Sequence, residues 1–550
     1  MRLEDLDERQ RGVVDVVASS DDRVLVLGGA GTGKTTTALW TARTYLETSS
    51  ETPLPRALFL TFSRAAVSQI VSRSPGVLSG SNSRIEILTF HGLSYWLLRA
   101  FGRYAGYGSA PIAVQSGART KLLGRDGTRL LYDDLIPGAT SLLKRSDRLR
   151  RLISSRWGLV VCDEAQDTSA DQWELIRLIG TRKLVLLGDF NQMIYSSFVP
   201  GVSTQQFRRV REWVDREVEL LPRSHRDPSG VIPAVAEAVR VRNFEHEAIV
   251  EAIRTERLYI HFDVDEDDYQ DILASEINKS RALGLRDVGV FAHSNVSVSE
   301  VAELLNNAGI DHALIGIPEA HSEALGCMAV QCAYAAGLAG DSDIREALAL
   351  FLTASVRGRD APPVALALIG AGALRSEVDA AIDKLEQALT SATYGTMGDL
   401  GQIAMRSWFG LSLAAGFRPW QRAAQHFGRL LSPVRDEPVN EDAVRRLQSI
   451  VSRSQNEALI DLDHSERSRV KLMTYHQTKS READTAIHVY RREDFFGREG
   501  EPFEEASRLL NVAITRARKR LVLILPRDPH PLVEPFNALR RVQASTLRSV

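Results

Sequence analysis

The residues best suited to chemistry form an octapeptide near the N-terminus, Gly28-Gly29-Ala30-Gly31-Thr32-Gly33-Lys34-Thr35. It fits the pattern G-x-x-x-x-G-K-[ST] and follows the apolar run Val24–Leu27, as a phosphate-binding loop between a strand and a helix must. Its glycines let backbone N–H groups approach an anion, and the helix that follows presents its positive end. Lys34 offers a charge to the outer phosphates, and the Thr35 hydroxyl offers a ligand to Mg²⁺. The octapeptide predicts that the chain binds a nucleoside triphosphate.

Two later apolar runs end in polar side chains that complete such a site. Leu159–Cys162 is followed by Asp163, which is suited to hold Mg²⁺ through the outer sphere, and by Glu164, which is placed to activate the attacking water. Leu184–Gly188 leads to Gln192, an amide suited to sense the γ-phosphate. Phosphoryl transfer needs mainly positioning and charge neutralisation, and these residue types supply both.

A parallel sheet is the element that brings such strand ends to one edge. Near-continuous apolar runs indicate strands buried on both faces, at Val24–Leu27, Ala57–Thr61, Ile85–Thr89, Leu159–Cys162 and Leu184–Gly188. Similar runs predict a second sheet, at Val288–Ala292, Val470–Thr474, Ala486–Tyr490 and Leu521–Leu525. Glu300–Ala308 has helical periodicity and ends before Gly309. Two further segments read as mostly helical, residues 95–155 and 320–465. We therefore expect an α/β protein with two parallel sheets, each carrying a helical insertion.

The composition is that of an ordinary globular protein of 550 residues, with 44% hydrophobic and 25% charged residues. The formal net charge of −2 is weak evidence against a nucleic-acid partner, because a local groove can be basic while the rest compensates. Cys162, Cys327 and Cys332 form no C-x-x-C motif, which fits a reducing compartment. The first residues are acidic, unlike a signal peptide, and no apolar stretch is long enough to span a bilayer. We expect a cytoplasmic protein without a membrane partner.

Taken together, these segments resemble the UvrD/Rep/PcrA group of superfamily 1 DNA helicases along most of the chain. The motifs that carry the resemblance occur in the family's order: Leu6–Gln10, Gly28–Thr35, Leu60–Ala66, Leu88–Gly92, Asp163–Asp167, Gly188–Tyr195, Ser224–Arg226, Met473–Glu482 and Arg508–Ala517. The resemblance implies two RecA-like P-loop NTPase domains with parallel sheets, each carrying a mostly helical insertion. It implies a first core at residues 1–222 with an insertion at about 95–155, a second core at 223–320 plus 466–550, and a reduced helical insertion domain at 321–465.

The resemblance also assigns roles at the nucleotide. ATP and Mg²⁺ are the implied cofactors, with Thr35 and Asp163 at the metal. The implied nucleotide contacts are Gln10 at the adenine, Gly28, Ala30, Gly31, Thr32, Gly33, Lys34, Thr35, Thr36, His225, and Glu482 at the ribose. The implied catalytic residues are Glu164, Gln192, and two arginines at the γ-phosphate, Arg226 and Arg516.

For DNA, the resemblance implies a single-strand path along Phe62, Thr89, His91, His476 and an aromatic residue, either Tyr195 or, in a shifted register, Phe198. The chain also departs from the family. His225 replaces a stacking tyrosine, and Thr36 replaces an arginine after G-K-T. The motif at Leu60–Ala66 is one residue short. The later helical insertion is shorter than the family's duplex-engaging domain, which affects strand separation more than hydrolysis.

The leading hypothesis is an ATP- and Mg²⁺-dependent DNA helicase and translocase that moves 3′→5′ on single-stranded DNA, in DNA repair, recombination or phage defence. Its expected partners are single-stranded DNA, junctions of single- and double-stranded DNA, and a nuclease or repair protein. One alternative is a DNA-activated ATPase switch that signals to a partner nuclease without processive unwinding. Another is a DNA-binding protein whose ATP site only gates affinity, and the intact Glu164 and Gln192 argue against it.

Overall fold

The structure is a computed structural model that describes residues 3–49, 55–62, 66–67, 70–71, 74, 77, 84–106, 114–124, 130–196, 199–315, 319–355, 360–373, 375–391, 394–414, 421–460, 468–479, 481–494, 496 and 499–548. The chain divides into two compact units. The first contains Met1–Leu97, Ile136–Gly316 and His464–Val550. The second contains Leu98–Leu135 and Ile317–Asp463.

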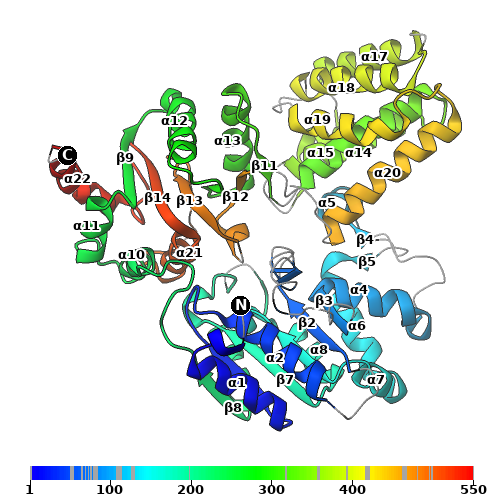
Figure 1. The fold of residues 1–550 in the computed structure, drawn as a ribbon. Helices are drawn as coiled ribbons and strands as arrows, with labels where there is room; N and C mark the ends of the chain where they lie inside the picture. The colour runs from blue at the N-terminus through cyan, green and yellow to red at the C-terminus, as the bar shows by residue number, and fades with distance from the viewer. Residues whose placement is uncertain are drawn as a thin grey trace. The chain divides into compact units, whose positions relative to one another are not determined.

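The first unit contains a six-stranded parallel sheet with the strand order β3-β2-β6-β7-β1-β8 (Figure 1). Its strands are β1 (Arg23–Leu27), β2 (Ala57–Thr61), β3 (Ile85–Thr89), β6 (Leu159–Cys162), β7 (Lys183–Gly188) and β8 (Arg216–Glu219). Helices α1 (Glu8–Ser19) and α2 (Lys34–Thr48) lie side by side and share one hydrophobic core with this sheet. The predicted parallel sheet is confirmed. The strand β8 was not predicted, because its residues other than Val218 are charged and it pairs only with β1 at the edge.

A second six-stranded parallel sheet in the same unit has the order β11-β12-β10-β13-β14-β9. Its strands are β9 (Leu258–Val264), β10 (Val288–Ala292), β11 (Ala313–Leu314), β12 (Val470–Thr474), β13 (Ala483–Val489) and β14 (Ala517–Pro526). Alternate residues of β14 enter two different cores: Leu521 and Leu523 pack with helices α10 (Val231–Arg240) and α21 (Glu504–Ile514). Val522 and Ile524 pack with α12 (Tyr269–Ala282) and α13 (Asn295–Asn307). Helices therefore cover both faces of the sheet, as its apolar strands require.

The second unit is mostly helical, as predicted, and also contains a two-stranded parallel sheet of β4 (Val114–Gln115) and β5 (Leu130–Leu131). Its helices include α5 (Gly117–Leu123), α14 (Glu319–Ala335), α15 (Asp341–Ser355), α16 (Pro363–Leu368), α17 (Ser376–Ser391), α18 (Met397–Ala414), α19 (Gln421–Leu431) and α20 (Glu441–Ile460). Glutamates of α14 hold the start of α5: Glu319 accepts from the Ala118 amide at 2.6 Å, and Glu323 accepts from the Ser116 hydroxyl at 3.0 Å. Segments from both expected insertions thus lie in one compact unit, whereas residues 136–155 belong to the first unit.

All three cysteines are buried and free. Among the described helices, none combines the length and the apolar character that crossing a bilayer requires.

Candidate active site

The loop between β1 and α2 has the backbone that its glycines permit. Gly31 and Gly33 have φ values of +78° and +91°, which side chains other than glycine rarely adopt. A Cβ on Gly31 would lie 2.6 Å from the Ser224 hydroxyl, and one on Gly33 would collide with the Gln10 amide. The loop is therefore a closely walled cradle, at the carboxyl end of β1 and the start of a helix.

Gln10 and Lys34 hold the cradle from inside. The Gln10 side chain donates to the Thr32 carbonyl at 3.2 Å and accepts from the Asp7 amide at 3.1 Å. Lys34 Nζ donates to the Gly28 carbonyl at 2.5 Å and to the Gly29 carbonyl at 3.0 Å. The ammonium group thus lies among carbonyls of its own loop, where it is available to a phosphate that enters the cradle.

Two carboxylates follow β6 at the same edge of the sheet. The Glu164 amide donates to Asp163 Oδ1 at 3.0 Å, and Glu164 itself has a φ of +56°. Burial, and then the neighbouring Glu164, raise the pKa of Asp163 to about 7. Burial acts to raise the pKa of Glu164 as well, but Lys479 and Lys34 outweigh it and leave that pKa below its usual value. Glu164 is therefore ionised at neutral pH, as a general base must be.

Lys479 is a site residue that sequence reasoning did not single out. It lies in the segment between β12 and β13 with 3% of its side chain exposed. Its Nζ forms an ion pair with Asp167, lies 3.5 Å from Glu164 Oε2, and donates to the Gln192 carbonyl at 2.9 Å. The lysine is present in the motif at Met473–Glu482, but the sequence does not show which acids, more than 300 positions away, it meets.

Two arginines reach the same site from segments beside α10 and α21, the helices that pack on the second sheet. Arg226 precedes α10, and its guanidinium donates to the Thr515 carbonyl at 2.7 Å and to Glu482 at 3.0 Å. Arg516 follows α21 and donates to Gln192 Oε1 at 3.1 Å. Burial and the nearby Arg226 lower the pKa of Arg516 to about 9, so its guanidinium remains charged at neutral pH.

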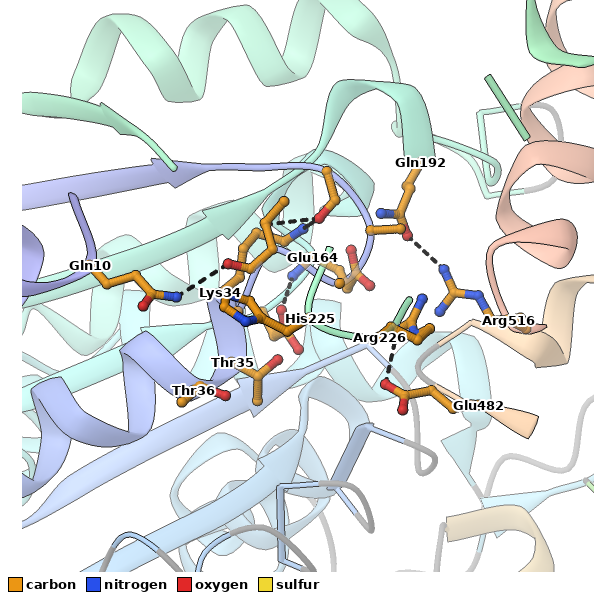
Figure 2. A pocket seen from close by; sticks show the side chains of 16 residues that line it. Gln10, Lys34, Thr35, Thr36, Glu164, Gln192, His225, Arg226, Glu482 and Arg516 are labelled. Carbon is orange, nitrogen blue, oxygen red and sulfur yellow. Dashed lines mark hydrogen bonds and ion pairs between the residues drawn. The ribbon is translucent and has the colours of Figure 1, made fainter. Parts of the chain in front are cut away.

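The site contains one cavity of about 240 Å³, shown in Figure 2. It is lined by every predicted nucleotide, metal and catalytic residue except Gly28, and by Gly29 in addition: Gln10, Gly29, Ala30, Gly31, Thr32, Gly33, Lys34, Thr35, Thr36, Asp163, Glu164, Gln192, His225, Arg226, Glu482 and Arg516. The His225 ring lies against Gly33, on the cradle.

The cavity fits the expected ligands chemically. Arg226 Nε is buried and has no hydrogen-bond partner among the described residues, so an unsatisfied cationic donor lies at the cavity. The Thr35 hydroxyl and the Asp163 carboxylate are hard oxygen donors, of the kind that Mg²⁺ takes together with phosphate and water.

Three of the predicted DNA contacts, Phe62, Tyr195 and His476, lie together. The Phe62 and Tyr195 rings lie 4.6 Å apart, and the Tyr195 hydroxyl donates to the His476 carbonyl at 3.1 Å. Thr89 Oγ1 accepts from the Gly92 amide at 2.9 Å. Burial lowers the pKa values of His91 and His476 to about 4, so both imidazoles are neutral at pH 7. Phe198 and residues 63–65 lie outside the described residues.

Comparison with known proteins adds two family matches. Residues 10–198 match the AAA domain, and residues 423–528 match the UvrD-like helicase C-terminal domain. The first match contains the phosphate-binding cradle and Glu164, and the second contains Lys479, Glu482 and Arg516.

Three curated relatives are DNA helicases by name. UvrD1 of Mycobacterium tuberculosis is 27% identical over 208 residues, which are 35% of this chain and 27% of the relative. PcrA of Bacillus subtilis is 20% identical over 369 residues, 55% of this chain and 49% of the relative. Rep of Escherichia coli is 39% identical over 67 residues, 12% of this chain and 10% of the relative. The chain thus spans less than half the length of each of these relatives.

A solved structure of two Pif1 helicases at forked DNA covers 49% of this chain and 57% of its own, at 16% identity and a TM-score of 0.25, which is too low to bear on the fold. The two family matches, the named relatives and the two parallel sheets agree with one another. The family matches and the named relatives support a UvrD-like superfamily 1 helicase.

Proposed function

We propose that this protein is an ATP- and Mg²⁺-dependent DNA helicase and translocase that moves 3′→5′ on single-stranded DNA. One observation carries the proposal. Arg516, between α21 and β14 of the second sheet, and Arg226, between β8 of the first sheet and α10, line the same cavity as Lys34 and Glu164 of the first sheet. Such a site is complete only when both sheets contribute to it, and arginines of this kind accelerate phosphoryl transfer by roughly 10³–10⁵.

In this proposal, Glu164 accepts a proton from the attacking water, and Lys34 neutralises the outer phosphates. Mg²⁺, held by Thr35 and Asp163, supplies further charge neutralisation when it is bound. Arg226 and Arg516 stabilise the charge that develops on the γ-phosphate. After the phosphate leaves, Arg226 binds Glu482 again and Arg516 binds Gln192 again. Hydrolysis therefore changes the contacts between the two sheets.

The substrate we propose is single-stranded DNA, with junctions of single- and double-stranded DNA as the site of unwinding. The Phe62 and Tyr195 rings support it, because adjacent aromatic faces can stack bases. We propose a cytoplasmic role in DNA repair, recombination or phage defence. The relatives UvrD1, PcrA and Rep are named as DNA helicases, which supports this substrate class.

Hydrolysis by Glu164→Gln and by the parent protein tests the catalytic part. We expect single-stranded DNA to stimulate the ATPase of the parent, and Glu164→Gln to bind nucleotide but hydrolyse it at least 100-fold more slowly. Glu47→Gln, a surface glutamate on α2, is the matched control and should leave the rate unchanged. The motor hypothesis fails if DNA does not stimulate hydrolysis or if Glu164→Gln hydrolyses normally.

Tailed duplexes test the direction. We expect unwinding of a 3′-tailed duplex and little unwinding of a 5′-tailed one. The reverse preference would contradict the proposed polarity. Strong DNA-stimulated hydrolysis with no unwinding of either duplex would favour the switch that signals to a partner.

A further inference from the structure

A second pocket lies in the first unit between α7 (Asp147–Ser154) and the end of α8 (Ala170–Ile179), two helices in contact with each other. We call it the arginine pocket. Its volume is about 330 Å³, and its lining includes Asp147, Arg150, Arg151, Ser154, Arg177 and Gly180. It shares no residue with the candidate active site.

The charge around this pocket is strongly unbalanced. Residues 144–156 contain six basic side chains and one acidic one, in a chain whose formal net charge is −2. Asp147 is paired with Arg150, and Glu174 of α8 is shared by Lys144 at 3.2 Å and Arg177 at 3.4 Å. Among the described residues no acidic group pairs with Arg145, Arg148 or Arg151, and all three are exposed.

The position of the pocket separates it from the nucleotide. Helix α7 ends at Ser154 and leads into β6, and Gly180 leads into β7. The pocket is therefore at the amino end of these strands, whereas the phosphate-binding cradle and Glu164 follow the carboxyl ends of β1 and β6. A strand of DNA on Phe62 and Tyr195, which also follow carboxyl ends, does not account for these arginines.

We propose that the arginine pocket binds the phosphodiester backbone of DNA at a second place on the protein, outside the single-strand path. This inference rests on the proposed function, which makes DNA the substrate. Guanidinium groups form paired hydrogen bonds with phosphate oxygens. An exposed guanidinium without an acidic partner breaks no ion pair when it binds phosphate. The only apolar side chain in the lining is Leu178, and no aromatic anchor of a protein interface is present there.

The test is the salt dependence of DNA binding without nucleotide. Arg151→Ala/Arg177→Ala removes two charges from the pocket, and Arg208→Ala/Arg209→Ala on α9 (Thr204–Trp213) removes two exposed arginines elsewhere. Fluorescence anisotropy with a labelled duplex, and separately with a labelled single strand, is measured from 50 to 200 mM salt. We expect the pocket variant to reduce the slope of log affinity against log salt by about 1.8 with duplex or about 1.4 with single strand. The control variant should match the parent.

Arg151→Lys/Arg177→Lys keeps the two charges and should keep most of the slope, which shows that the loss is electrostatic and not a folding defect. An unchanged slope in the alanine variant with both DNAs overturns the proposal. Binding of poly-glutamate is measured in the same way. If the alanine variant loses binding to poly-glutamate but binds DNA like the parent, the proposal is overturned in favour of an acidic protein partner. Failure of DNA to stimulate ATP hydrolysis would refute the proposed function instead, and these titrations contain no nucleotide, so the two failures are distinguishable.

Discussion

Each charged group at the candidate site already has a protein partner. Lys34 lies on the Gly28 carbonyl, Arg226 on Glu482, and Arg516 on Gln192. Binding of a nucleotide therefore exchanges these contacts for phosphate contacts, and the net gain is smaller than the sum of the new interactions. Arg226 Nε is buried and has no hydrogen-bond partner among the described residues. A hydrogen bond from this donor to a phosphate oxygen would replace no existing hydrogen bond, so it contributes most to the net gain.

Gly33→Ala is expected to abolish nucleotide binding. The backbone at Gly33 has a φ of +91°, and a methyl group there would collide with Gln10, which in turn supports the Thr32 carbonyl. The control is Gly12→Ala in α1, where a methyl group meets nothing within 4 Å. Binding of a fluorescent ATP analogue measures both, and wild-type affinity in Gly33→Ala would refute this account of the cradle.

At this scale the sequence was informative where chemistry restricts residue type. Glycines, a lysine and a hydroxyl at fixed spacing identify the cradle, because few other residues can do that work. Lys479 is different, since its role comes from an ion pair with Asp167, which is 312 positions away in the sequence. Spacing along the chain carries no such information.

At the scale of elements, the segment between β12 and β13 sets the charge state of Glu164 through Lys479. Lys479→Met removes the cation that lowers the pKa of Glu164, while burial remains to raise it. We expect the acid limb of the pH profile of ATP hydrolysis to move to higher pH. Steady-state rates between pH 5 and 9 measure the shift.

Lys471→Met on β12 is the control, because Lys471 is not among the residues that line the cavity. This variant should keep the pH profile of the parent protein. A variant that lost activity equally at every pH would show that Lys479 only supports the fold, and would contradict its effect on Glu164.

Helix α12 carries one buried carboxylate that contacts two strands of the second sheet. Glu276 lies 2.8 Å from His261 on β9 and 2.6 Å from Arg520 on β14. Burial acts against its charge, but His261 and Arg520 lower the pKa of Glu276 to about 2, below its value of about 4.3 in an unfolded chain. The stabilisation is thus complete above pH 4.3 and is lost as the pH falls from there towards 2.

Glu276→Gln is therefore expected to destabilise the second sheet by about 3–5 kcal/mol at pH 7, because Arg520 stays buried without its ion pair. Thermal unfolding followed by circular dichroism at pH 7 and pH 3 checks this, with the exposed Glu251→Gln on α11 (Glu247–Arg254) as control. A difference between variant and parent that did not narrow at pH 3 would contradict the assignment.

Periodicity predicted the buried strands well and the others poorly. The central strands β1, β6 and β7 are continuous apolar runs because helices cover both faces. β8 is charged and β11 has two residues, so neither has a pattern to detect. β9 alternates with polar residues such as His261, which is half-buried at the edge of its sheet.

At the scale of the whole molecule, sequence order hides which segments pack together. The segment Leu98–Leu135 joins Ile317–Asp463 in one compact unit, although about 180 residues of the first unit separate them. The contacts responsible include Leu122 in the hydrophobic core of that unit, the ion pair of Arg119 with Glu346 at 3.0 Å, and the hydrogen bond from the Ala118 amide to Glu319. Helical periodicity predicted the helices but contains nothing about these pairings.

Nucleotide binding is expected to stabilise segments of both sheets, because the cavity has walls from each. With a non-hydrolysable ATP analogue at 100 times its Kd, binding adds about 2.7 kcal/mol to the opening free energy of the segments it holds. Amide hydrogen exchange should then slow by up to about 100-fold in peptides that contain Gly31, and also in those that contain Lys479 or Arg516.

Two variants test whether the nucleotide protects segments of both sheets. Gly33→Ala should lose protection everywhere, since no analogue binds. Arg226→Ala keeps the cradle, so peptides around Gly31 should remain protected while those around Arg516 lose protection, because the γ-phosphate no longer draws both arginines. Protection confined to the cradle in the parent protein would mean that the nucleotide does not join the two sheets, and a motor that works by opening and closing between them would then lack its drive.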